Sequence, residues 1–417
     1  MIDIRRPPAW LLGSAAALFL ASVVLVVLGL PPKVFPTASW HDGGLRLFRD
    51  DHETSIYFER SRWIDEGAFP YTAGHEQEYP PAAALYFALP RLFFHDQAGY
   101  EKAFLFLNAA LFALLVGLTV ALLRRFGRPA RLAWLLFLPA SLYFSIWRFD
   151  LLPAVLVAWF LLAAIDERMT SAFVALTLAV LTKYYPALFF LPLFMMLGAR
   201  SWSAETIRRS RNGLLAVAAI VVVVIGIVAA TAGFATLVSP LVFHLSRDFE
   251  VGSLGALLLW YPVILGADIS LIGRALLILF TVLQLAPAVL FVMRGRVLDR
   301  VSLVRGCLFL LLPFLLFNRF FSPQWLLWFT PIYLLVSRPR ETAALAVLDI
   351  LTFLQFPVFF GIDPYGLPYF FVCLARTAII AYLAVVNWRA MEFSGPLAMA
   401  RHPSDHRSVE GRPATAA

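Results

Sequence analysis

Charged side chains are scarce in this chain, and their scarcity excludes a soluble globular protein. Asp, Glu, Lys and Arg make up 14% of the residues, whereas hydrophobic residues make up 61%. Soluble domains carry about 25% charged residues, because their surfaces face water. The balance seen here is that of an integral membrane protein whose surface faces lipid.

Cysteine and nucleotide-binding motifs are also nearly or wholly absent. The two cysteines, Cys307 and Cys373, lie inside apolar runs. They exclude a disulfide framework and a cysteine-based zinc site. The chain has no Walker, Rossmann or nucleophile-elbow pattern, which argues against a nucleotide-sugar donor. No cofactor and no metal site are predicted, although Asp50, Asp51 and Glu53 are close enough in sequence to gather a divalent cation.

Apolar runs of helical length recur along the chain. The run from Trp10 to Leu30 has no small-residue cleavage site before Pro31, and is therefore interpreted as a retained span and not a signal peptide. An all-α polytopic membrane domain is predicted over residues 1–390, with a disordered cytoplasmic tail at 391–417. About twelve spans (roughly 11 to 13) of bilayer-crossing helix are expected, near residues 10–30, 100–123, 132–147, 151–165, 171–182, 184–198, 213–232, 271–293, 303–317, 323–336, 342–360 and 368–387.

Arginines predict the orientation, since short cytoplasmic loops retain basic residues. They cluster on alternate connections, at residues 5–6, 124–131, 208–211, 294–300 and 338–340. Both termini are then cytoplasmic in a plasma-membrane protein, and residues 31–99 and 233–270 and the turns near Arg148, Lys183, Arg319 and Asp363 face outward. The net charge of +8 follows from this topology, and no nucleic-acid partner is needed to explain it.

The first outer loop, residues 31–99, contains a dense polar stretch from Asp50 to Pro81. Residues 53–67 have the apolar spacing of an amphipathic helix at the membrane surface that ends at Gly67. The double proline before residue 82 opens a second helix, over residues 82–94. Three carboxylates, Asp50, Asp51 and Glu53, lie where the first helix begins. They either cap that helix or carry chemistry.

Several short pieces, in order, resemble glycosyltransferase family 87, one of the polytopic C-type (GT-C) glycosyltransferases that use lipid-linked sugars. A carboxylate four residues before a tyrosine comes first, as Glu53 and Tyr57, where the family has an aspartate. The others are EGAFPY (66–71), EYPP (78–81), WRFDLLPA (147–154), LTKYYP (181–186), FHLSRDFEVGS (243–253) and FNRFFSPQWLLW (317–328). The resemblance implies metal-independent transfer of a sugar, mannose, from a polyprenyl-phosphate donor to a lipid or glycan acceptor outside the membrane.

The chemistry of such a transfer needs a base near the acceptor hydroxyl and cations near the departing phosphate. No general acid is required, because phosphate is already a good leaving group. A single displacement would invert the anomeric centre, unlike the two-carboxylate scheme of retaining hydrolases. Glu53 is the first candidate for the base, with Asp51 as the alternative and Asp50 just upstream.

Lys183 is the leading candidate for contact with the donor phosphate. It is one of only three lysines, with Lys33 and Lys102, and it separates two apolar runs. Its alternative role is to reach the membrane boundary without binding substrate. Three arginines predicted to face outward, Arg148, Arg247 and Arg319, could bind the same phosphate in bidentate fashion. Their alternative role is to pair with an acid such as Asp150 or Asp248. Arg247 and Arg319 are the favoured phosphate contacts, because each lies in a piece that resembles the family.

Candidate substrate-binding residues occur in the same outer pieces. They are His244, Glu78, Tyr79, Tyr184 and Gln324. Each has an ordinary structural alternative: a hydrogen-bonded histidine, a solvated turn carboxylate, an interfacial aromatic belt or the start of a helix.

Two other functions stay open. A lipid or glycan transporter, such as a flippase, would use the outer acids as a gate. Against it, no internal repeat is evident and the charges gather at the outer ends of the predicted spans and not near their middles. An inactive scaffold of the same fold is the other alternative, because Glu53 occupies the aspartate position of the family.

Overall fold

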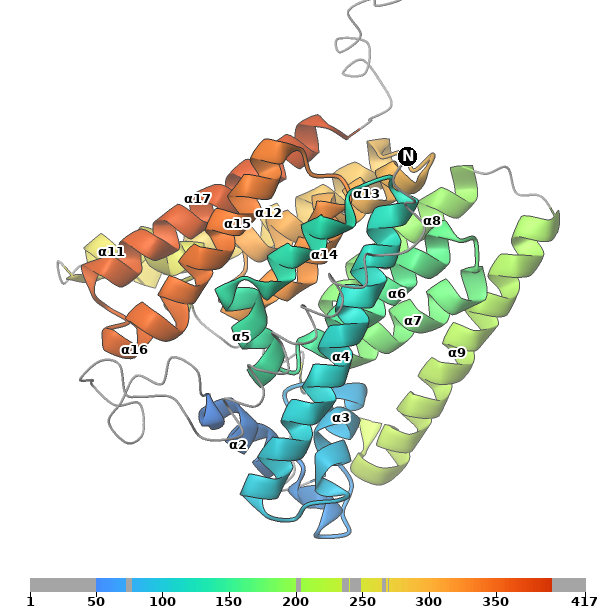
Figure 1. Cartoon of the computed structure of the whole chain (residues 1–417), viewed down its shortest axis with the longest axis horizontal. Coiled ribbons are helices and arrows are strands. Elements are labelled where there is room, and N and C mark those ends of the chain that lie inside the picture. Colours follow the sequence, from blue (N-terminus) through green and yellow to red (C-terminus); the bar gives the residue numbers. More distant parts are fainter. Residues whose placement is uncertain are drawn as a thin grey trace, which may run out of the picture.

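The computed structural model describes residues 50–72, 77–199, 204–234, 240, 249–264, 268 and 270–391. Every regular element in these ranges is helical, as predicted (Figure 1). The N-terminal half contains α2 (Asp51–Arg60), η1 (Arg62–Ile64), α3 (Pro81–Arg91), α4 (Gln97–Arg125), η2 (Ala130–Phe137), α5 (Pro139–Trp147), α6 (Leu151–Ile165), α7 (Met169–Thr182), η3 (Tyr185–Phe189), α8 (Phe190–Ala199) and α9 (Ala204–Ala232). The C-terminal half contains α11 (Leu254–Ile264), α12 (Ser270–Arg294), α13 (Arg300–Leu316), η5 (Pro323–Trp325), α14 (Leu326–Leu334), α15 (Pro339–Phe353), the π-helical turn η6 (Leu354–Phe359), α16 (Phe360–Ile362) and α17 (Leu367–Arg389).

Long apolar helices bear out the prediction of a helical membrane protein. Within the described ranges, 5 helices are long and apolar enough to cross a bilayer: α4, residues 210–232 of α9, α12, residues 339–362 and α17. The η2–α5 pair could form a further span, bent by 68°. The other predicted spans coincide with shorter apolar helices, such as α6 and α7, so the number of spans stays a prediction. The expected first span, residues 10–30, and the tail, 392–417, lie outside the described residues.

Two groups of helices meet along a shared core. In one, α6 packs on α4 and α7, and α9 covers the far side of α7 (Figure 1). In the other, α17 packs against α13 and α15, with α12 beside α13. The short helices α5 and α14 lie between the groups, where α5 contacts α15 and α14 contacts α6 and α13. This junction holds the WRFD and SPQW segments, so residues distant in sequence are brought together there.

The segment before α4 packs onto the helices through a small aromatic cluster. Tyr57 of α2 stacks on Phe87 of α3, with 4.6 Å between ring centroids. Phe149, which follows α5, meets the same rings edge-on. The predicted helix over 53–67 is therefore shorter, ending at Arg60 before the turn η1, and its apolar side packs on α3 and α4. Burying aromatic area against protein is what fixes α2 in place.

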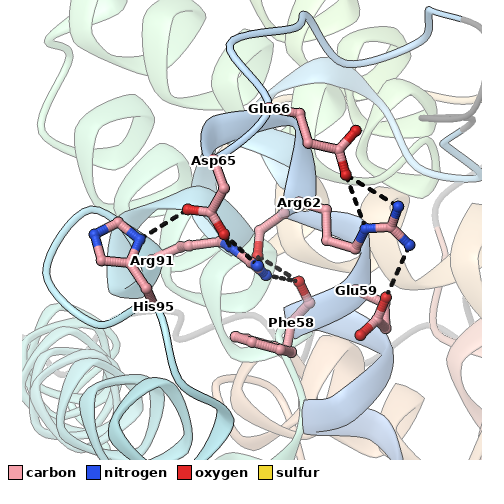
Figure 2. A network of polar contacts seen from close by, with 8 residues as sticks. Phe58, Glu59, Arg62, Asp65, Glu66, Arg91 and His95 are labelled. Carbon is pink, nitrogen blue, oxygen red and sulfur yellow. Dashed lines mark hydrogen bonds and ion pairs between the residues drawn. The ribbon is translucent and has the colours of Figure 1, made fainter.

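Arg91, at the end of α3, holds this segment through contacts with Asp65 and Phe58 (Figure 2). Its Nε donates to Asp65 Oδ2 at 2.6 Å, its Nη1 donates to the carbonyl of Phe58 at 2.6 Å, and its guanidinium lies 4.1 Å from the centre of the Phe58 ring. His95 contacts the other oxygen of Asp65 at 2.8 Å. The hydrogen bond from Arg91 holds the pKa of Asp65 below its usual range, with a smaller effect from His95.

The connection over residues 233–270, predicted to face outward, contains a helix. α11 covers Leu254–Ile264 and packs on α17 through Trp260 and Phe370, whose ring centroids are 5.2 Å apart. This helix is not among the predicted spans, although the run LGALLLWYPVI is apolar.

Candidate functional site

Two of the three candidate acids converge on one arginine. Arg148, the residue after α5, pairs through Nη2 with Asp50 Oδ2 at 2.5 Å and through Nη1 with Glu53 Oε1. The side chain of Arg148 is 6% exposed and that of Asp50 is 8% exposed, whereas Glu53 keeps 25% of its side chain exposed. Of the two carboxylates, Glu53 is therefore the more accessible.

The helix-capping interpretation does not hold for Asp50. Asp50 is at the N-cap position of α2, but its side chain makes no capping hydrogen bond and turns instead to Arg148. A buried guanidinium without a carboxylate would cost more than an unsatisfied helix end that water can reach. Asp51 is the first residue of α2.

A second ion pair lies near the first, and its carboxylate is fully buried. Lys183, between α7 and η3, contacts Asp150 Oδ1 at 2.6 Å, and Trp328 of α14 donates to the same oxygen at 3.0 Å. Asp150 is 0% exposed, and Lys183 is 16% exposed. Asp150 thus pairs with Lys183, and not with an outer arginine as one of the sequence alternatives supposed.

Aromatic rings surround the ammonium group of Lys183. Its Nζ lies 4.7 Å from the ring centre of Phe149, 5.0 Å from that of Trp328 and 5.6 Å from that of Tyr79. Tyr185 stacks on Trp328 at 3.9 Å. Lys183 does not simply extend to the membrane boundary, because its charge is held by a carboxylate and by ring faces.

The turn that carries Arg148 and Asp150 is positioned from the opposite end of α5. Asp349 of α15 accepts hydrogen bonds from the backbone N–H groups of Ala140 and Ser141, at 2.8 and 2.9 Å, and from the Ser141 hydroxyl at 2.6 Å. These are unpaired donors at a helix N-terminus, where a carboxylate is favoured. The Asp349 carboxylate fixes where α5 begins, and the position of α5 in turn sets where Arg148 lies at its other end.

The remaining sequence candidates are more dispersed. Glu78 lies 3.9 Å from Arg60, Tyr184 is 36% exposed, and Gln324 is half buried in η5. The backbone carbonyl of Arg319 accepts from the N–H of Glu250 at 2.9 Å, which joins the FEVGS and FNRFF pieces. Arg247 and His244 lie outside the described residues.

Asp349 and Arg376 lie buried inside predicted spans, and so correct the sequence argument that charges gather at the outer ends of the spans. Asp349 is 2% exposed and Arg376, in α17, is 1% exposed, so the charges do not gather only at span ends. A polar signal was present, since each residue interrupts an apolar run. Sequence reasoning missed their importance because most of the groups that they contact, such as Ser141 for Asp349 and Gln355 for Arg376, lie far from them in the sequence or on another element.

No cluster of three His, Cys, Asp or Glu side chains able to hold a metal ion occurs in the described part of the chain. The sequence matches no protein-family model, and no curated protein matches it. The resemblance to glycosyltransferase family 87 therefore stays a prediction.

Proposed function

We propose that the chain is a membrane glycosyltransferase that moves a sugar from a polyprenyl-phosphate donor to a lipid or glycan acceptor on the outer face. The observation that carries the proposal is the convergence of Glu53, Asp50, Arg148 and the Lys183–Asp150 pair at the ends of apolar helices. Acid and cation side by side are what transfer from a phosphate requires.

Glu53 is the proposed base. It removes the proton of the acceptor hydroxyl while the hydroxyl oxygen attacks the anomeric carbon, and the bond from that carbon to the phosphate oxygen breaks. The configuration inverts, because attack and departure occur on opposite faces. Asp50 keeps Arg148 in place, and Arg148 and Lys183 balance the charge of the departing phosphate.

The aromatic residues suit a sugar bound at this position. Tyr79 is partly exposed beside Lys183 and can pack its ring against the apolar face of a hexose, whereas Phe149 and Trp328 are buried behind it. Mannose is the sugar that the sequence resemblance implies.

Membranes containing the protein, supplied with radiolabelled polyprenyl-phosphate mannose and a lipid extract, test the proposal. The wild type should form a new glycolipid, Glu53→Gln should abolish it, and Asp51→Asn should leave substantial activity. Glu59→Gln is the matched control, because Glu59 lies on the same helix and pairs with the exposed Arg62 at 3.3 Å. Loss of activity in Asp51→Asn with retention in Glu53→Gln would move the base upstream.

A transporter is the second candidate, favoured by the buried charges of Asp349 and Arg376 within apolar helices. The same membranes separate the two functions. Movement of an intact labelled lipid between leaflets, with no new glycosidic bond, would replace the transferase by a flippase. If the membranes yield no glycolipid and the labelled lipid does not move between leaflets, the inactive scaffold remains as the explanation.

A further inference from the structure

One side of helix α3 carries four large apolar side chains that stay exposed. Leu85, Leu89, Leu92 and Phe93 are 59%, 44%, 54% and 76% exposed, respectively. The three leucines follow the i, i+4, i+7 spacing of one helix face, and Phe93 comes directly after them. We call these four residues the α3 ridge. An apolar ridge of this size is unfavourable in water, and its exposure therefore indicates a partner.

The polar groups of α3 face the protein and not the ridge. Arg91, the one charged residue of α3, is buried and contacts Asp65 and the carbonyl of Phe58 (Figure 2). The hydroxyl of Tyr86 and the backbone carbonyl of Phe87 also take part in hydrogen bonds to α4. A helix with its polar groups turned inward and its apolar groups turned outward suits an apolar surrounding.

The contacts of α3 with α4 show how deep α3 lies. Residues 103–123 of α4 carry no charge, between Lys102 at the predicted outer end and Arg124 at the predicted cytoplasmic end. Such a stretch is long enough to cross about 30 Å of hydrocarbon. Tyr86 donates to Asn108 Oδ1 at 2.5 Å, and Asn108 lies inside the charge-free stretch. α3 therefore reaches the level of the hydrocarbon boundary.

From that level, α3 runs outward alongside the first turns of α4. Before α3 begins, Tyr79 packs on Phe149 with 4.7 Å between ring centroids. Asn108 donates to the carbonyl of the adjacent Arg148 at 3.3 Å, so this end of α3 lies near the level of Asn108. At the other end, residues 92–96 lead directly into the start of α4. The α3 ridge thus extends from the charge-free part of α4 to its outer end.

We propose that the α3 ridge is embedded in the outer leaflet, with Leu85 against acyl chains and Phe93 among the head groups. The partner of this surface is a lipid bilayer. The inference is independent of sugar transfer. It also changes which element contacts lipid, because the sequence placed an amphipathic helix over 53–67 at the membrane surface, whereas α2 packs on α3 and α4.

Contact between α3 and lipid has a consequence for the candidate site. Tyr57 of α2 stacks on Phe87 of α3 with 4.6 Å between ring centroids, and Glu53 lies one turn earlier on α2. The bilayer thereby supports the helix that carries Glu53.

Spin labels on introduced cysteines measure the depth of the ridge in the full chain, reconstituted in phosphatidylcholine nanodiscs. Both native cysteines are 0% exposed, so the label reacts with the introduced one. Leu85→Cys, Leu89→Cys and Phe93→Cys are compared by their collision rates with oxygen, which concentrates in hydrocarbon, and with a water-soluble nickel chelate. Leu114→Cys, at an exposed position in the middle of α4, is the hydrocarbon reference. Arg62→Cys, in the exposed polar network of η1, is the aqueous reference.

The ratio of oxygen to nickel collisions should approach the Leu114 value at Leu85 and fall through Leu89 to Phe93. Ratios equal to the Arg62 value along the whole ridge would overturn the inference, because the ridge would then lie in water. Slow collisions with both reagents at Leu85 and Leu89 would also overturn it, because protein would then cover the ridge.

Leu85→Asp tests the same surface by stability. Its melting temperature in nanodiscs should fall below that of Leu85→Ala, which removes the side chain without adding a charge, because a carboxylate is costly beside acyl chains. Leu85→Lys should be affected less than Leu85→Asp, since a lysine can extend its ammonium group to the interface. In water an exposed aspartate in this helix would carry no such cost. A melting temperature of Leu85→Asp equal to or above that of Leu85→Ala would therefore refute the lipid contact.

Discussion

Asp150 offers the sharpest test of how the candidate site is held together. Asp150→Asn has nearly the same shape and keeps an oxygen for the indole of Trp328, but it removes the negative charge beside Lys183. Lys183 then remains as a buried cation against ring faces and an amide oxygen, with Glu78 as the carboxylate still near it. The variant therefore isolates the electrostatic part of the pair.

The structure sets the size of the effect. Removing one partner of a buried ion pair costs about 3 to 5 kcal/mol. Lys183 is 16% exposed and lies within 5.0 Å of two ring centres, so some of its charge stays compensated. We expect Asp150→Asn to cost about 3 kcal/mol, at the low end of that range. Lys183→Met should cost about 5 kcal/mol, because it leaves the fully buried carboxylate unpaired.

The double variant Asp150→Asn/Lys183→Met removes both charges and should be more stable than either single variant. Unfolding is followed by tryptophan fluorescence during SDS titration of mixed micelles. A single variant within about 1 kcal/mol of wild type, or a double variant less stable than both singles, would refute the argument that the two charges depend on each other.

Three further predictions concern stability. Arg91 holds the pKa of Asp65 low, so the stabilisation from this carboxylate is complete above the ordinary aspartate pKa and is lost as pH falls through the lowered pKa of the folded state. Asp65→Asn should therefore flatten the acid side of a plot of melting temperature against pH. An unchanged acid side in this variant would contradict the prediction. Asp349→Ala should lower the free energy of unfolding by about 3 kcal/mol, because it leaves the first N–H groups of α5 unpaired. Asp349→Asn keeps one acceptor oxygen and should lower it less. Both are measured in the same SDS titration. Gly252→Ala should lower the free energy of unfolding by about 1 to 2 kcal/mol, because φ is +89° there and the new methyl group would lie 2.8 Å from the Tyr369 hydroxyl. The control is Gly117→Ala, in the middle of α4 with open space around it, which should be neutral or stabilising.

Local sequence signals predicted much of the helical framework. The apolar runs at 100–123, 151–165 and 368–387 correspond closely to α4, α6 and α17, because a helix in lipid satisfies its own backbone and needs only an apolar run of sufficient length. The run at 132–147 was also found, but not its sharp bend at Leu138 and Pro139. A bend of this kind depends on the partner that satisfies the broken backbone, here Asp349.

The candidate site was predicted in part. Glu53, Asp50, Arg148 and Lys183 stood out because charges are expensive beside apolar helices, and the structure brings all four to one region. Their pairing could not be predicted from spacing. Arg148 is 98 residues from Asp50, and which acid meets which cation depends on how α5, α6 and α7 pack.

The sequence by itself determined the class of protein and its main helices: long uncharged apolar runs are typical of membrane-spanning segments, and a helix satisfies the backbone of such a run internally. Tertiary structure alone decided which charges are paired and which one is left with neutral neighbours. The physical reason is that hydrophobicity and helix formation are properties of contiguous residues, whereas the compensation of a buried charge depends on side chains from other helices within a few ångströms. Asp150 and Lys183 belong to the paired class, and Arg376 to the other.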